Sequence, residues 1–420
     1  MNRGPQMMRS SRLSGGGPAE GARTAEQRAI RVTNGHLFPI VKAAYFFWFG
    51  AMGSLIPYLP LHYLDIGLTG RQIGLLFGVA PFMTLIAAPL WGAVADILRQ
   101  HKRIMAITIS GVCLCVLGIF LARDVRLLLL FAVLNTLFTA PSIALIDHTT
   151  LSLLGERRTL YGRQRVWGAV GWGLMGTLVG YLTQWMGLSW SFYAFFVMMV
   201  VTLLIALRMP IESPPARIPY GAAVRVLMQR RWLIIVFVTV FVQMAARATG
   251  FGFLTVHLDD LGATRGVIGL SVAIASVSEV PIFFFGNSLL QSLGRRGTLL
   301  FSLGATCLLL LGYGLAPDPS VILLVQVFQG PALSGMWIAA VDYTRSAAPD
   351  SMGATTQALL EAVVWGLGVG TGNLVAGVLY DAAGAAVLFR VAATAVAVVG
   401  VFFFVASRSI PAKIEQDGTD

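Results

Sequence analysis

The sequence contains few charged residues. Charged residues make up 12% of its 420 residues and apolar residues 56%, whereas soluble domains contain roughly 25% charged residues. A soluble fold would have too few polar side chains to cover its surface at this composition. The sequence therefore predicts a polytopic membrane protein, with the lipid bilayer as its surroundings.

Cysteine is also scarce. The three cysteines, Cys113, Cys115 and Cys307, all lie in apolar stretches, which argues against an aqueous disulfide framework and against a zinc site. No Ser/His/Asp, metal or nucleotide constellation is present. The glycine run Gly366–Gly372 lies inside an apolar stretch, where small residues favour close helix packing. We therefore expect no enzyme activity and no cofactor.

Acidic residues are outnumbered, with 19 Asp and Glu against 30 Lys and Arg. The basic residues gather in the loops on the side of the predicted helices that would also hold both termini. Few basic residues fall on the opposite side: Arg71, Arg123, Arg126, Arg265 and Arg390. This asymmetry is the positive-inside bias and predicts cytoplasmic termini in the cell membrane. The net charge of +11 is thus a topology signal and gives no reason to expect a nucleic-acid ligand.

Long apolar runs make up most of the sequence. Crossing a bilayer as a helix takes about 20 apolar residues. We identify twelve such runs, at 37–59, 71–95, 104–122, 127–150, 164–186, 188–208, 232–257, 266–292, 298–315, 320–345, 355–379 and 385–406. The expected fold is an all-α membrane protein of twelve transmembrane helices.

The two halves of the chain repeat one another. Leu59–Thr69 matches Leu254–Thr264 in register, and Asp147 matches Asp342 at the same offset. Duplicated membrane bundles commonly bind a solute near the midplane, where the repeats meet. We therefore expect a cytoplasmic disordered tail (1–36), a six-helix bundle (37–208), a cytoplasmic linker (209–231), a second six-helix bundle (232–406) and a cytoplasmic tail (407–420).

The loop between the second and third apolar runs carries a charged pattern. The segment Gly92–Arg103 reads GAVADILRQHKR, so that Gly92 and Asp96 close one helix and Lys102 and Arg103 open the next. A carboxylate and a basic cluster of this kind can bridge helix ends. The chain resembles the major facilitator superfamily, and this loop resembles its signature, departing at Ile97 and Arg99. The resemblance implies a gating role for Gly92, Asp96, Lys102 and Arg103.

A second motif narrows the resemblance. Tyr161–Gly173 reads YGRQRVWGAVGWG and Met52–Pro60 reads MGSLIPYLP; both are similar to segments of the lactose permease family, which includes oligosaccharide:proton and nucleoside:proton symporters. The resemblance implies that Asp147, Arg165 and Trp172 bind substrate. It covers the first five apolar runs and fades in the second half.

The residue types agree with that implication. Arg165 and Trp172 are about two helical turns apart and share one stripe of their helix. An arginine presents a bidentate fork to hydroxyls or a carboxylate, and an indole presents a flat apolar face. A lone charge in lipid is costly, so Asp147 and Arg165 are expected to pair in the interior. A structural ion pair, with Trp172 as ordinary packing, is the alternative.

Isolated carboxylates mark the second half. Glu279 and Glu361 lie in apolar surroundings, where ionisable residues are functional candidates, and each is a candidate proton carrier or a structural hydrogen-bonding group. Gln326 and Gln329 stand where the resemblance places a histidine and an acid. Because glutamine holds no transferable proton, either Glu279 or Glu361 would carry the coupled proton, unless the protein is a uniporter or uses another ion. Asp342 is expected at a helix end near Arg345.

The sequence thus predicts a transporter that works by alternating access, expected to be a monomer, with proton-coupled uptake of a sugar or glycoside as the first choice. A nucleoside or an aromatic acid is the alternative substrate, and Arg247 would favour an acid. A receptor that kept the fold and lost transport is a further alternative. Substrate-binding residues are Asp147, Arg165, Trp172, Gln326 and Gln329; further lining candidates are Tyr45, Trp48, Met52 and Trp337.

Overall fold

The computed structural model describes residues 39–98, 101–154, 161–209, 231–347 and 353–409. All regular elements within these ranges are helical. The expected tails and the linker between the bundles lie almost wholly outside the described residues. Their boundaries stay predictions.

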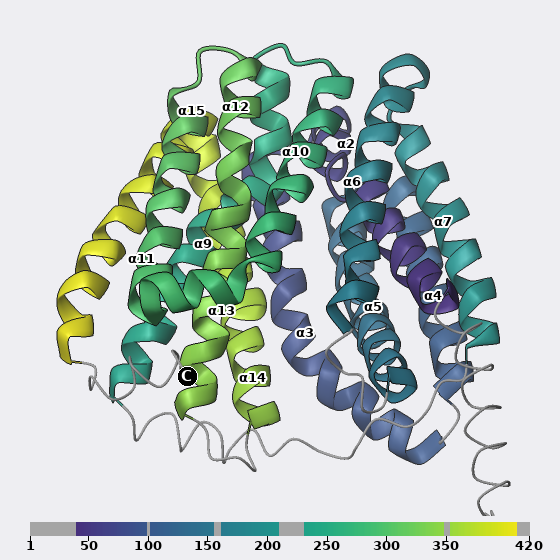
Figure 1. Cartoon of the computed structure of the whole chain (residues 1–420). Coiled ribbons are helices and arrows are strands. Elements are labelled where there is room, and N and C mark those ends of the chain that lie inside the picture. The colour runs from purple at the N-terminus through teal and green to yellow at the C-terminus, as the bar shows by residue number, and fades with distance from the viewer. Residues whose placement is uncertain (1–38, 99–100, 155–160, 210–230, 348–352, 410–420) are drawn as a thin grey trace, which may run out of the picture.

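Six membrane crossings form the first half, which Figure 1 colours from purple to teal. The first is made by residues 39–55 together with α2. The others are single long helices, and in order the elements are α2 (Leu59–Asp65), α3 (Gly70–Leu98), α4 (His101–Leu121), α5 (Val125–Leu154), α6 (Tyr161–Met186) and α7 (Ser189–Arg208).

The second half is more interrupted. Short and irregular segments break several of its crossings, as the bounds show: α9 (Arg231–Asp260), α10 (Arg265–Phe284), α11 (Gly286–Leu315), α12 (Pro319–Val325), η2 (Gln326–Phe328), α13 (Gln329–Ala347), α14 (Gly353–Glu361), the π-helix η4 (Ala362–Gly368), α15 (Val369–Ala406) and η5 (Ser407–Ser409). Local 3₁₀ and π-helical segments of this kind keep backbone groups hydrogen-bonded where an α-helix is interrupted in the membrane.

The crossings add up to twelve in two bundles. Ten helices of the described chain are long and apolar enough to span a bilayer. One of them, Thr356–Ala406, contains two crossings, because the chain turns at Gly384 with φ 77° and ψ 173°. The less apolar α6, with two arginines in its first turns, supplies the remaining crossing. The predicted all-α membrane fold is confirmed, and the described helices are compatible with the predicted twelve crossings.

One predicted boundary is wrong. The run 266–292 was expected to form a single span, but α10 ends at Phe284 and α11 begins at Gly286. Residues 286–293 form a short lead-in helix, and Gly294, with φ 67°, bends the chain into the next crossing. The polar side chains of this lead-in are exposed, so it is too polar to continue a crossing through lipid.

The two halves pack through two helix pairs, α3 with α15 and α6 with α10. Glycines bring the backbones together. A Cβ atom on Gly74 would lie 2.6 Å from the carbonyl oxygen of Asn373, and one on Gly180 would lie 2.7 Å from that of Arg265. Small residues permit such close approach between membrane helices.

Hydrogen bonds between the halves concentrate at one end of these pairs. Asp381 accepts from the backbone amides of Gly70 and Arg71, at 2.7 and 2.9 Å. Gln184 accepts from the backbone amide of Gly266 at 3.1 Å. We call this the closed end.

The opposite end is different. Neither α13 nor α14 packs extensively on a described helix of the first half. Figure 1 shows the lower ends of these two helices on one side of the molecule and those of α3 and α5 on the other. The halves therefore meet at the closed end and separate towards the other end, which we call the open end.

Candidate functional site

Asp147 and Arg165 form an ion pair between α5 and α6. The Arg165 Nη1 atom donates to Asp147 Oδ2 at 2.8 Å. The Arg165 side chain is 46% exposed and that of Asp147 is 24% exposed. The pairing expected from the sequence is therefore present, and it faces an accessible space rather than a sealed core.

Two tyrosines fix the geometry of this pair. The Tyr45 hydroxyl, from the first crossing, donates to Asp147 Oδ1 at 2.5 Å, and Arg165 Nη1 also donates to the Tyr161 hydroxyl at 2.7 Å. Each carboxylate oxygen of Asp147 thus accepts one hydrogen bond and keeps a further lone pair. A guanidinium carries five N–H donors, and the hydrogen bonds described for Arg165 use Nη1 alone. Its remaining donors are available to a solute.

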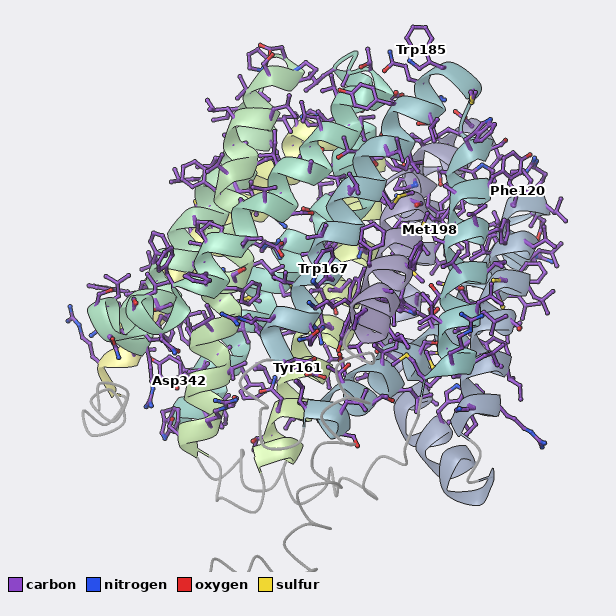
Figure 2. The ribbon with its side chains drawn as sticks, turned by 45° about the vertical axis from the view of Figure 1, so that its right-hand side comes forward. Phe120, Tyr161, Trp167, Trp185, Met198 and Asp342 are labelled. Carbon is purple, nitrogen blue, oxygen red and sulfur yellow. The ribbon has the colours of Figure 1, made fainter. Side chains whose placement is uncertain are left out.

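The group lies towards the open end of α6. Figure 2 shows Tyr161 near the lower end of this helix and Trp185 at its upper end. The helix begins at Tyr161, so Arg165 is one turn into it. From there α6 continues to the closed end, where it packs on α10.

Glu361 faces this group from the second half. It is the last residue of α14, its side chain is exposed, and its charge interacts with those of Arg165 and Asp147. Gln357, one turn earlier, hydrogen-bonds to it. The π-helix Ala362–Gly368 follows directly, and π-turns within helices are frequent at functional sites. The structure thus places Glu361 within electrostatic range of the Asp147–Arg165 pair, across the space between the halves.

Glu279 has a different environment. Its charge interacts with that of Arg247 on α9, which is only 5% exposed. Arg247 Nη1 contacts the sulfur of Met244 at 3.7 Å, and its Nε has no hydrogen-bond acceptor among the described residues. Glu279 and Arg247 therefore form a separate, balanced pair of charges inside the second bundle.

The other predicted substrate residues are not all part of the Asp147 group. Trp172 is partly buried, and its backbone lies against Gly53 of the first crossing. Gln326 is 2% exposed and accepts a hydrogen bond from the Tyr313 hydroxyl at 2.6 Å. Gln329 begins α13, beside Gly330, where α13 packs closely on α10. The structure thus separates Gln326 from Asp147 and Arg165.

The predicted gating loop is only partly described. Gly92 and Asp96 lie in the last turns of α3, and their side chains fall outside the described residues. Lys102 and Arg103 are exposed in the first turn of α4. Their gating role stays a prediction.

Asp342 has a partner that the sequence did not indicate. It was expected at a helix end near Arg345; it lies in the last turns of α13 and pairs with Arg295 Nε on α11. Arg295 follows the bend at Gly294, and this bend turns the side chain towards α13. The repeat-matched residues Asp147 and Asp342 therefore both bind an arginine, from non-equivalent helices. Only the basic Arg295–Arg296 pair in the sequence could have hinted at this contact.

Comparisons with known proteins agree with this architecture. The model of the MFS_1 like family matches residues 39–391. The maltose permease of Geobacillus stearothermophilus is 28% identical over 82% of this chain and 87% of its own length. The probable 3-phenylpropionic acid transporter of Escherichia coli (strain K12) is 25% identical over 84% and 93%, respectively.

Solved structures show the same fold. The crystal structure of the nucleoside transporter NupG superimposes with a TM-score of 0.76 at 16% identity, over 89% of this chain and 99% of the other. Identity at this level supports the fold alone. The family match extends over most of the chain and confirms the resemblance to the major facilitator superfamily. The chain belongs to the MFS_1-like family of multi-pass membrane transporters.

Proposed function

We propose that this transporter takes up a sugar or glycoside together with protons, by alternating access across the cytoplasmic membrane. The observation that carries the proposal is the Asp147–Arg165 pair, held by Tyr45 and Tyr161 and faced by Glu361. Carboxylates accept hydrogen bonds from sugar hydroxyls, and the unused arginine N–H groups donate to them. The maltose permease relative supports the same substrate class.

The charges of the site support proton coupling. Asp147 and Glu361 are acidic and Arg165 is basic, so the group carries one surplus negative charge when all three are ionised. An unpaired charge enclosed within the membrane is costly. A proton bound by Glu361 would remove the surplus as the halves close over the site. Glu279 has Arg247 as its counter-charge, so of the two candidates we assign the proton to Glu361.

For the proposed uptake, the orientation assigns substrate release to the open end. The positive-inside bias places both termini and the open end in the cytoplasm. Under this assignment the described conformation faces inward, with the outer side closed by Asp381 and Gln184. Substrate and proton would leave through the open end.

An aromatic acid is the second candidate substrate. Arg247 is buried and its Nε lacks an acceptor among the described residues, so a carboxylate that reached it would gain a hydrogen bond. The relative named as a probable 3-phenylpropionic acid transporter points the same way. A nucleoside, or a receptor role without transport, are the remaining alternatives.

The test is transport by purified protein in liposomes, with internal pH recorded after addition of glycosides, nucleosides or aromatic acids. Arg165→Ala is compared with the wild type and with Arg163→Ala, which removes an exposed arginine of the same turn. We expect a glycoside-dependent acidification in the wild type and in Arg163→Ala, and none in Arg165→Ala.

Two results would contradict the proposal. Normal uptake by Arg165→Ala would show that Arg165 is not part of the substrate site. If no compound changes the internal pH, the proposal of proton symport is wrong. Tracer counterflow would then distinguish a uniporter from a receptor that binds its solute without transporting it.

A further inference from the structure

Two tryptophans of the second half form a pair that the Asp147–Arg165 group does not include. Trp337 lies on α13 and Trp365 lies in the π-helix η4, with ring centroids 6.3 Å apart and an interplanar angle of 54°. Trp365 is 41% exposed and Trp337 is partly buried. The pair therefore presents accessible indole surface.

The face of α13 that carries Trp337 points away from α11. Gly335 packs on Ser302 of α11, and Asp342, two turns later, pairs with Arg295 of α11. A helix turns by about 100° per residue, so Trp337 lies about 200° around the helix from Gly335. The indole is thus on the side opposite α11.

Trp365 shares its face with Glu361. Residues four positions apart lie above one another on a helix, while Leu360 and Val364 are fully buried on another face. The charge of Glu361 interacts with those of Arg165 and Asp147 in the first half. The tryptophan pair therefore belongs to the same wall as Glu361, and this wall faces the first-half group.

We propose that Trp337 and Trp365 form the second-half wall of the substrate site, and that the substrate is a glycoside with two rings. One ring would be held by Asp147 and Arg165, and the other would stack on the tryptophan pair. Indoles suit this role because their flat faces are apolar and their N–H groups remain able to hydrogen-bond. This inference rests on the proposed function and narrows its substrate class.

Two rings also fit the requirements of alternating access. A ligand shifts a conformational equilibrium only by binding one state better than another. A solute with one ring at Arg165 meets the second half only near Glu361. A second ring on the tryptophan pair connects both halves, so the bound solute favours their approach at the open end.

The experiment is tracer counterflow in liposomes, which needs no proton gradient. A monosaccharide, a disaccharide and a phenyl glycoside of the same sugar are compared in the wild type, Trp365→Ala, Trp365→Phe and Trp337→Ala. Trp185→Ala is the matched control, because this indole is 81% exposed at the closed end of α6. Thermal unfolding of each purified variant checks its fold.

We expect Trp365→Ala and Trp337→Ala to raise the KM for both two-ring glycosides by up to about tenfold, with monosaccharide exchange and Trp185→Ala unchanged. Trp365→Phe keeps a stacking face and should stay within about threefold of the wild type. Equal losses for one-ring and two-ring sugars, or no change in Trp365→Ala, would overturn the inference and leave the proposed function in place. A wild type that exchanges no glycoside would overturn both.

Discussion

Asp381 accepts a hydrogen bond from the backbone amide of Gly70, 2.7 Å away across the boundary between the two halves. Gly70 begins α3, and the first amides of a helix have no partner inside it. A carboxylate there also interacts favourably with the helix dipole. Gln184 accepts from the amide of Gly266 in the other crossing pair. Both helix pairs therefore end in the same kind of contact, which exists only while this end is closed.

Asp381→Ala should therefore shift the protein towards a state open at this end. The substitution removes two charge-assisted hydrogen bonds, each worth roughly 1.5–3 kcal/mol, and we expect the open population to rise at least tenfold. Distances between spin labels at the exposed positions Asp65 and Ala383 report the change. Asp124→Ala is the control, because Asp124 caps α5 within one half. An unchanged distance distribution would show that the contact does not hold the halves together.

Glu361→Gln should uncouple the proton. We expect the variant to lose uptake against a gradient but keep counterflow, with a counterflow rate that no longer depends on pH, because the amide holds no transferable proton. Glu279→Gln should instead lower stability, since it leaves Arg247 without its counter-charge. Accumulation of substrate by Glu361→Gln would transfer the coupling role to another residue.

Arg295→Ala should destabilise the second bundle. Arg295 is 5% exposed and pairs with Asp342, whose side chain is 27% exposed. Loss of the arginine leaves a partly buried charge unpaired and costs up to about 3 kcal/mol. Thermal unfolding in detergent measures the loss. The double variant Arg295→Met with Asp342→Leu should recover most of it, because no uncompensated charge remains. A single variant as stable as the wild type would mean that the pair adds nothing to stability.

Gly171→Ala should disturb the packing of α6 on the first crossing. A Cβ atom there would lie 2.2 Å from the carbonyl oxygen of Phe46, and overpacking costs about 1–3 kcal/mol. Gly162→Ala, in the same helix, meets nothing within 4 Å and should be neutral or slightly stabilising, since alanine favours helix. Melting temperatures compare the two. Equal values would show that the helices move apart at little cost.

Several features of the protein could be predicted from its sequence. The positions of the crossings follow from apolar runs, because each crossing must bury its backbone groups in lipid. The Asp147–Arg165 pair was expected because two opposite charges in adjacent apolar runs have few other partners. The family was already indicated by Tyr161–Gly173 and the charged loop after the second run.

Other features were decided only by the tertiary structure. Apolar periodicity does not say which face of a crossing meets which neighbour, and small rotations of a helix change its contacts. The sequence therefore did not predict the pairing of Arg295 with Asp342, the capping of α3 by Asp381, or the burial of Gln326 against Tyr313. The position of Glu361 opposite Arg165 also depends on how the two halves pack. The sequence by itself determined which segments enter the membrane, because that depends on local transfer from water to lipid. The tertiary structure determined which side chains meet inside it, because that depends on the packing of helices far apart in the chain.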